Sequence, residues 1–245
     1  MNLIKYSLLR YFDKKIIIIL AIFVIYSTIQ LFTSLIMSKL GLSSPMIQKE
    51  SFMSIAVSNM IQSSGLFISI ITIFKFASEI KNNNLLLIMI VGRKKSFFLK
   101  DLIVFYITTI IILFISSAFL ISIFIIFFHV GAYSSFDLAN LFTRSLSTTL
   151  MSFLLSIIIV FFFKSAIISI LIYLGYSFTE NILGFYYHMK LGYPLDTLPF
   201  RLSNIIDFNS ITSIGLFSTY IILLMGLQYL VLMNFFKNPN IIVED

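Results

Sequence analysis

The chain has 245 residues, of which 59% are hydrophobic and only 11% carry a charge. A mean hydropathy of +1.04 excludes a soluble globular domain of this length, which needs more charged surface to stay in solution. The chain contains no cysteine, so neither disulfide bonds nor thiolate chemistry contributes. We therefore expect an all-α, polytopic helical membrane protein that forms a single transmembrane domain over residues 1–245.

The first predicted element is a short helix at residues 1–15. Its apolar positions are Ile4, Leu8, Tyr11 and Phe12, and its basic positions are Lys5, Arg10, Lys14 and Lys15. Apolar side chains at helical spacing among basic ones are typical of a helix that lies in the membrane interface. We expect this interfacial helix to precede the first span.

Six stretches with few or no charged residues follow and predict six membrane spans, since a hydrocarbon core of roughly 30 Å needs about 20 apolar residues as helix. The predicted spans are 16–38, 53–76, 102–128, 145–163, 165–184 and 210–236. If the fourth and fifth formed one helix, residues 146–184 would measure about 58 Å, nearly twice the hydrocarbon core. A tight hairpin at 163–165 is therefore expected, although neither Gly nor Pro marks it.

Basic residues are distributed unequally between the two sides that these spans create. With the N-terminus inside, 12 of the 17 Lys and Arg residues lie in inner segments and 5 in outer segments. Because cytoplasmic loops retain basic residues, we expect both termini in the cytoplasm. The net charge of +7 then reflects contact with anionic membrane lipid, and no nucleic-acid partner is expected.

The loop between the second and third predicted spans is polar at both ends and apolar at its centre. It reads EIKNNNLLLIMIVGRKKSFFLK at residues 79–100, and its apolar run is too short to cross a membrane. Gly92 follows that run and permits a tight turn. The pattern predicts a short cytoplasmic helix at the membrane surface that presents Glu79, Lys81 and residues 82–84 to a cytoplasmic partner. The alternative is a loop that only sets the topology.

Polar residues inside the predicted spans are candidates for a translocation path. Asn59, Gln62 and Ser63 fall at i, i+3 and i+4, so they share one face of the second span. Such a face either lines a wet cavity or bonds to neighbouring helices. Glu180 is the one carboxylate close to the interior of a span, where an acid is a functional candidate. It fits the outer boundary of a short helix equally well.

Sequence motifs of catalysis are absent. No G-x-x-x-x-G-K-[ST] loop is available to bind ATP. The two histidines, His129 and His188, have no second ligand at a spacing typical of a metal site. We therefore expect no metal site and no enzymatic activity in this chain.

The order of these features resembles the permease subunit of type-two ATP-binding-cassette (ABC) exporters. The shared order is an N-terminal interfacial helix, two spans, a cytoplasmic segment of the form E-x-K/R…G-R-x-x…K, a long third span, a hairpin between spans four and five, and an outer excursion before span six. Glu79, Gly92, Arg93 and Lys100 match the cytoplasmic segment, although Arg93 follows Gly92 directly. The fifth span and the outer excursion match in hydropathy alone.

The resemblance implies that a separate ATPase dimer, which binds ATP and Mg²⁺, docks on the segment after the second span. Two permease subunits, identical or related, would then open a path outward for a peptide, a bacteriocin or a lipid-like molecule. Together with the polar residues of the same segment, the expected coupling interface is Glu79, Lys81, Asn82, Asn83, Asn84, Gly92, Arg93 and Lys100. No cofactor is expected in this chain. The alternatives are a secondary transporter, which Glu180 favours, and a membrane-embedded enzyme whose catalytic cluster the sequence does not reveal.

Overall fold

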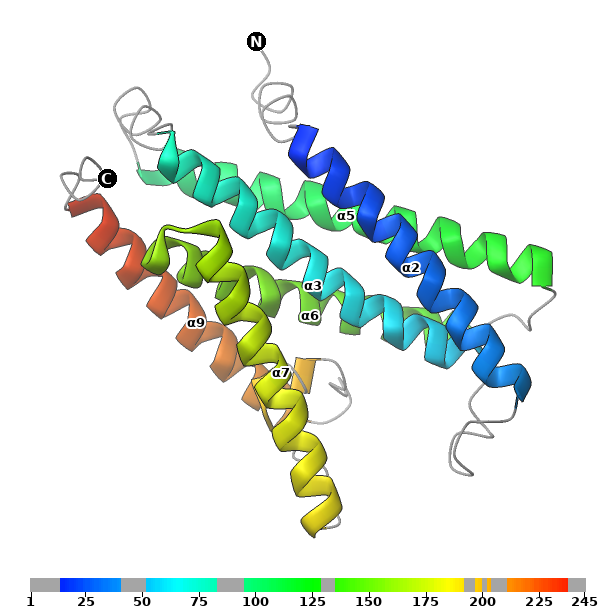
Figure 1. The fold of residues 1–245 in the computed structure, drawn as a ribbon. Helices are drawn as coiled ribbons and strands as arrows, with labels where there is room; N and C mark the ends of the chain where they lie inside the picture. Colours follow the sequence, from blue (N-terminus) through cyan, green and yellow to red (C-terminus); the bar gives the residue numbers. More distant parts are fainter. Residues whose placement is uncertain are drawn as a thin grey trace.

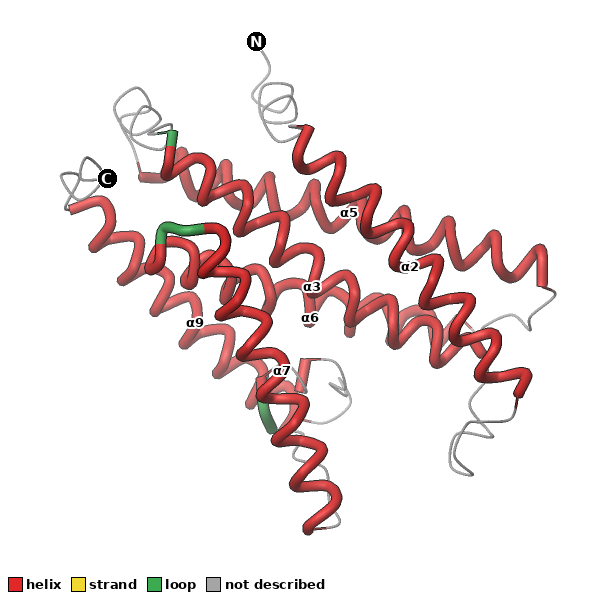
Figure 2. Tube along the Cα trace, in the orientation of Figure 1, coloured by secondary structure: helices red, strands yellow, loops and turns green. Residues whose placement is uncertain are grey.

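The chain folds into a bundle of long helices. The computed structural model describes residues 14–40, 52–82, 95–128, 135–191, 197–199, 202–203 and 211–237. Within these residues every regular element is helical (Figure 2), and the long helices are α2 (Lys14–Leu40), α3 (Phe52–Lys81), α5 (Lys95–Phe128), α6 (Ser135–Phe163), α7 (Ala166–Leu191) and α9 (Ile211–Lys237). All six are long and apolar enough to cross a membrane. The prediction of an all-α chain with six candidate spans is confirmed.

Several helices extend beyond the predicted spans. α3 continues to Lys81 instead of ending near residue 76, and α6 begins at Ser135 instead of residue 145. Helix can continue past the apolar stretch because each added residue keeps its backbone groups hydrogen-bonded. The predicted interfacial helix lies outside the described residues except for its last two, Lys14 and Lys15, which begin α2. Most of the predicted cytoplasmic helix also lies outside them.

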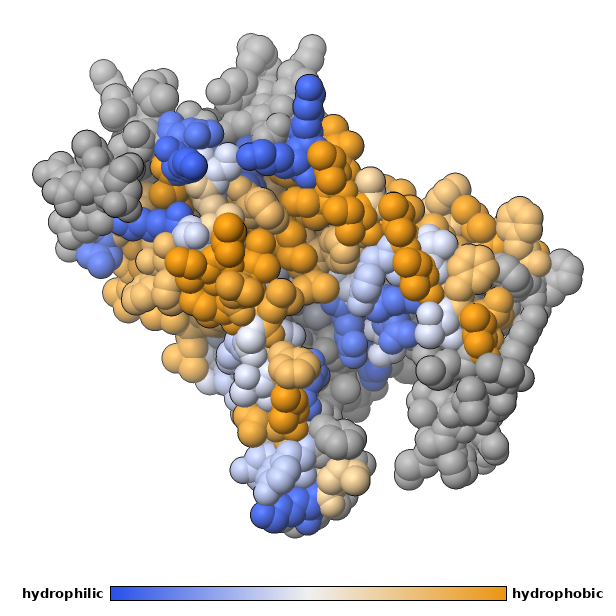
Figure 3. Space-filling model, viewed as in Figure 1, coloured by the Kyte–Doolittle hydropathy of each residue, from blue (hydrophilic) through white to orange (hydrophobic). Residues whose placement is uncertain are grey.

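Two helices, α3 and α6, form the centre of the bundle. In their apolar stretches 78% and 72% of the residues are buried, against 11% in α9. α2 and α5 pack on one side of this pair, and α7 and α9 pack on the other (Figure 1). The outer helices expose large apolar side chains, among them Phe119, Phe127 and Ile222. Figure 3 shows apolar flanks on one face of the bundle in orange. A lipid bilayer would cover such flanks.

The helix ends gather at two ends of the bundle. One of these, which we call the hairpin end, holds the start of α2, the end of α3, the α6–α7 connection and the end of α9 (Figure 1). Hydrophilic atoms collect there in Figure 3. The first and last long helices therefore begin and end on the same side of the bundle, as six spans require. That the hairpin end faces the cytoplasm stays a prediction.

The connection between α6 and α7 is a tight hairpin, as predicted. α6 ends at Phe163 and α7 begins at Ala166. Lys164 reverses the chain with φ 55°, a left-handed conformation that glycine adopts most easily. Its N–H donates to the carbonyl of Val160 (2.8 Å), and the carbonyl of Ser165 accepts from the N–H of Ser169 (3.0 Å). A backbone-bonded two-residue turn thus replaces the glycine that the sequence lacks.

Phenylalanine rings fill the core near the hairpin end. Phe76 on α3 lies 5.7 Å from Phe105 on α5 and 5.9 Å from Phe161 on α6, measured between ring centroids. Phe161 in turn lies 5.0 Å from Phe235 on α9. These edge and tilted contacts link four helices and each adds about 0.5–1.5 kcal/mol to the burial of the rings.

The connection between α7 and α9 returns to the bundle. The Thr148 hydroxyl on α6 donates to the carbonyl of Ser203 (3.3 Å), and the Tyr220 hydroxyl on α9 donates to the carbonyl of Thr197 (2.9 Å). Ser203 is completely buried. The described residues of this connection, 197–199 and 202–203, therefore contact α6 and α9.

Candidate functional site

A line of small residues brings α3 and α6 close together at the centre of the bundle. We call it the α3–α6 seam, and it consists of Gly65, Ser69, Thr148, Ser152 and Ser156. A Cβ atom placed on Gly65 would lie 2.8 Å from Cγ2 of Thr148 and 3.0 Å from Oγ of Ser152. Small residues four apart on facing helices allow this approach of two backbones within a membrane.

Hydrogen bonds connect α3, α6 and α7 at the seam. The Ser69 hydroxyl on α3 donates to the carbonyl oxygens of Gly65 (3.0 Å) and Ser152 (3.2 Å). The Tyr173 hydroxyl, which comes from α7, donates to Oγ of Ser152 (3.1 Å) and to the carbonyl of Gly65 (3.4 Å). The Ser69 and Tyr173 hydroxyls thus connect neighbouring helices, and Tyr173 ties α7 to the α3–α6 pair.

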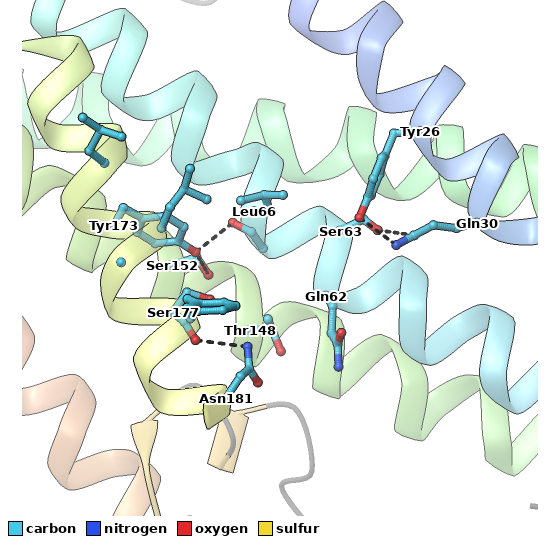
Figure 4. A pocket seen from close by; sticks show the side chains of 15 residues that line it. Tyr26, Gln30, Gln62, Ser63, Leu66, Thr148, Ser152, Tyr173, Ser177 and Asn181 are labelled. Carbon is cyan, nitrogen blue, oxygen red and sulfur yellow. Dashed lines mark hydrogen bonds between the residues drawn. The ribbon is translucent and has the colours of Figure 1, made fainter. Parts of the chain in front are cut away.

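A cavity of about 680 Å³ opens beside the seam, with α3 and α2 on one side, α7 on the other and α6 at its floor (Figure 4). Its lining residues are Tyr26, Gln30, Gln62, Ser63, Gly65, Leu66, Thr148, Ser152, Leu171, Tyr173, Leu174, Gly175, Ser177, Phe178 and Asn181. All of them lie within the candidate membrane spans. Many are polar, yet none of these lining residues carries a charge.

The polar face of α3 serves both of the uses that the sequence left open. Asn59 Nδ2 donates to the Ser34 hydroxyl on α2 (3.2 Å), and the Ser63 hydroxyl donates to Oε1 of Gln30 (2.5 Å). These two residues therefore hold α3 to α2. Gln62, one helical turn from Asn59, is exposed and points into the cavity (Figure 4).

The opposite wall of the cavity comes from α7. Asn181 is exposed and donates through Nδ2 to the carbonyl of Ser177 (3.0 Å). Its side chain faces the same space as Gln62 (Figure 4). Sequence reasoning missed Ser177 and Asn181, although their i, i+4 spacing beside Glu180 was a detectable signal.

Glu180 is buried inside the bundle. It is only 3% exposed and lies within the candidate span Ala166–Gly184, four residues before its end. Tyr176, one turn earlier on α7, forms a side-chain hydrogen bond with it. Of the four predicted path residues the structure therefore brings Gln62 and Ser63 into the cavity, whereas Asn59 and Glu180 are not among its lining residues.

The expected coupling residues differ in exposure. Lys81, Asn82 and Lys100 are exposed, as the prediction requires. Glu79 is not presented to the cytoplasm: it is 4% exposed, lies within α3 and forms an ion pair with Lys75 (3.1 Å). The expectation of an exposed Glu79 is wrong because the helix continues past residue 76 and brings Lys75 and Glu79 one turn apart. The remaining predicted residues, Asn83, Asn84, Gly92 and Arg93, lie outside the described part of the chain.

Among the described residues, no group of three or more His, Cys, Asp or Glu side chains is placed to hold a metal ion. Comparisons of the chain with models of protein families, with curated proteins and with solved structures gave no match.

Proposed function

We propose that this chain is the membrane-spanning permease subunit of an ABC exporter. The order of its elements supports this function, and the observation that carries it furthest is the uncharged polar cavity of about 680 Å³ within the candidate spans. The volume falls within the roughly 300–1,000 Å³ typical of small-molecule sites. A permease needs such a space between helices that can move relative to one another.

α3 is the element that would couple ATP hydrolysis to the cavity. It runs without interruption between the cavity, at Gln62, and the hairpin end, at Lys81, over about 28 Å. The exposed residues Lys81 and Asn82, with Lys100 on α5, offer an ATPase a polar surface at that end. The Lys75–Glu79 ion pair stiffens the last turns of α3.

The movement itself would separate α3 from α7. The seam holds α3 and α6 together, so a push on α3 moves the pair as one body. α7 joins that body through the hairpin and through Tyr173. Along α7, Tyr173 lies between the hairpin and the lining residues Ser177 and Asn181. α7 would pivot about these two points and widen or close the cavity further out.

The proposed complex contains a separate ATPase dimer that binds ATP and Mg²⁺ and a second permease subunit, identical or related. It resides in the bacterial cytoplasmic membrane with both chain ends in the cytoplasm. Reporter domains fused after Lys237 should behave as cytoplasmic, and reporters inserted near Thr197 as external. The opposite result would overturn the proposed orientation.

The function is tested by co-expressing the chain with candidate ABC ATPases, starting with any that is encoded next to its gene. Lys81→Glu reverses an exposed charge at the hairpin end and should weaken the binding free energy of the ATPase by about 1–2 kcal/mol. Less ATPase should then co-purify with the chain, and permease-stimulated ATP hydrolysis should fall to a matching degree. Lys190→Glu is the matched control, because Lys190 is equally exposed but lies on the other end of α7. If Lys81→Glu and Lys190→Glu stimulate hydrolysis like the parent chain, the α3 docking surface is wrong.

Glu180 favours a second candidate function, a secondary transporter driven by an ion gradient. A carboxylate that is 3% exposed within a candidate span is a typical site for proton or cation coupling. This function predicts that vesicles containing the chain alone take up or release the substrate when a pH gradient is imposed across their membrane. Glu180→Gln would then abolish the gradient-driven flux and leave any ATP-driven flux in place.

A further inference from the structure

We propose that the cavity binds an uncharged amphiphile that enters sideways from the bilayer. Its hydrogen-bonding head would lie between the amides of Gln62 and Asn181. Its apolar chain would lie along the α7 rim, by which we mean Leu171, Leu174 and Phe178. This names a substrate class for the cavity, and it rests on the proposed function only for the direction of transport.

The lining determines the charge of the ligand. Gln62 and Asn181 each bring an amide with donors and an acceptor to the cavity, from opposite walls. The hydrogen bonds that hold α2 to α3 use Asn59 and Ser63 and leave the Gln62 amide out. Because no lining residue is charged, an ion placed here inside the membrane would cost several kcal/mol without compensation. A neutral head that donates and accepts hydrogen bonds fits this environment.

The α7 rim determines the rest of the ligand. Leu171 and Phe178 line the cavity and are also 64% and 67% exposed on the flank of the bundle, with Leu174 between them. Figure 3, which has the orientation of Figure 1, shows a hydrophilic patch in a hollow between two apolar surfaces. An apolar chain could pass from the bilayer over this rim without meeting a polar barrier. A ligand with a polar head and an apolar chain therefore matches both parts of the site.

Gly175 is a lining position with room for a side chain. It lines the cavity from α7, and a Cβ atom placed on it meets nothing within 4 Å. A leucine at this position is expected to extend over the cavity. Gly226 on α9 has the same free surroundings but is not among the lining residues. The chain thus offers a cavity-filling variant, Gly175→Leu, and a matched control, Gly226→Leu.

The test is photolabelling of the full chain in lipid nanodiscs with three diazirine probes of equal chain length. The probes are a monoacylglycerol, an alkyl sulfonate and an alkyl trimethylammonium, which are neutral, anionic and cationic. The neutral probe should label α3 and α7 peptides at the cavity at least about tenfold more than either ion, since an uncompensated charge is costly there. Excess unlabelled monoacylglycerol should remove that labelling.

The variants decide whether the label reports the cavity. Gly175→Leu should lower neutral labelling by about fivefold or more, and Gly226→Leu should leave it unchanged. Gln62→Leu should lower it by about fivefold, the equivalent of one lost hydrogen bond. Equal labelling by all three probes, or labelling that Gly175→Leu leaves intact, would mean annular lipid contact and would overturn the inference. Labelling that vanishes when two copies of the chain assemble would overturn it too, because a second copy would then be the occupant.

Photolabelling needs no ATPase, so its result separates this inference from the proposed function. A labelled cavity in a chain that stimulates no ATPase would keep the ligand class and reject the exporter. An unlabelled cavity in a chain that stimulates its ATPase would keep the exporter and reject the ligand class.

Discussion

The α3–α6 seam and the cavity beside it use the same kinds of residues and behave in opposite ways. In the seam, a Cβ atom on Gly65 would lie 2.8 Å from Thr148, whereas at the cavity a Cβ atom on Gly175 meets nothing within 4 Å. Ser69 and Ser152 are bonded across the seam, whereas Gln62 faces open space. The comparison teaches that the separation between helices decides what a small or polar residue does here, and not the residue type.

The two regions also differ in what they contribute. Hydrogen bonds between membrane helices average about 0.6 kcal/mol each, so the seam stabilises the fold by close packing together with several modest bonds. Gly65, Thr148 and Ser152 belong to both regions, whereas the other lining residues of the cavity lack such close packing. Those other residues can therefore change with a smaller cost in stability, and this makes the cavity a suitable place for a ligand site.

The largest expected effect comes from adding a methyl group to the seam. Gly65→Ala should lower the free energy of unfolding by about 1–3 kcal/mol, because α3 and α6 must move apart to admit it. The measurement is the unfolding transition of the purified chain in mild detergent. Gly175→Ala is the matched control, and it should be neutral or slightly stabilising because alanine favours helix over glycine. Equal losses for both variants would contradict the distinction between seam and cavity.

The hairpin that joins the seam helix α6 to the cavity helix α7 carries the next largest effect. Lys164→Gly should stabilise the chain by about 1 kcal/mol relative to Lys164→Ala, because only the glycine relieves the left-handed conformation at φ 55°. Both variants remove the same charged side chain, so their difference isolates the backbone. Identical unfolding transitions for the two would show that the turn stores no strain.

The tie between the seam and α7 should contribute less. Tyr173→Phe removes the hydroxyl that donates to Ser152 and to the carbonyl of Gly65, and should cost about 0.6 kcal/mol. Tyr229→Phe on α9 is the control, since Tyr229 is exposed on the flank of the bundle. A loss no larger than that of Tyr229→Phe would mean that α7 is held by apolar packing alone.

The bundle's elements could be predicted from the sequence because they depend on chain length and local composition. Six charge-poor stretches predicted the six candidate spans, and the length of residues 146–184 predicted the hairpin without any glycine. The burial of Glu79 was missed because the predicted span ended near residue 76. The ion pair with Lys75 could have been noticed from their i, i+4 spacing, which is local.

The candidate site could be predicted only in part, since it depends on which helices meet. The spacing of Asn59, Gln62 and Ser63 identified a polar face on α3 but left its use open. The choice between bonding and lining a cavity is made by Gln30 on α2 and by the distance to α7. Tyr173 joins the seam from a helix more than 100 positions away from Gly65, and no pattern within one helix reveals such a contact.

The smallest effect on stability, and the most direct view of the two regions, comes from single cysteines in this cysteine-free chain. Gln62→Cys should change the free energy of unfolding by less than about 0.5 kcal/mol, because Gln62 is exposed at the cavity and does not hold α2 to α3. A small, uncharged polar thiol reagent should nevertheless react with it, since the cavity offers such a molecule hydrogen-bonding side chains. Ser69→Cys, in the fully buried seam, should stay unmodified until the chain unfolds. If Gln62→Cys reacts no faster than Ser69→Cys, the cavity does not admit a polar molecule and the contrast between the two sides of α3 is lost. If the proposed exporter complex forms, trapping ATP on its ATPase should change the rate at Gln62→Cys and leave Ser69→Cys unmodified, because the cavity would change shape while the seam stays closed.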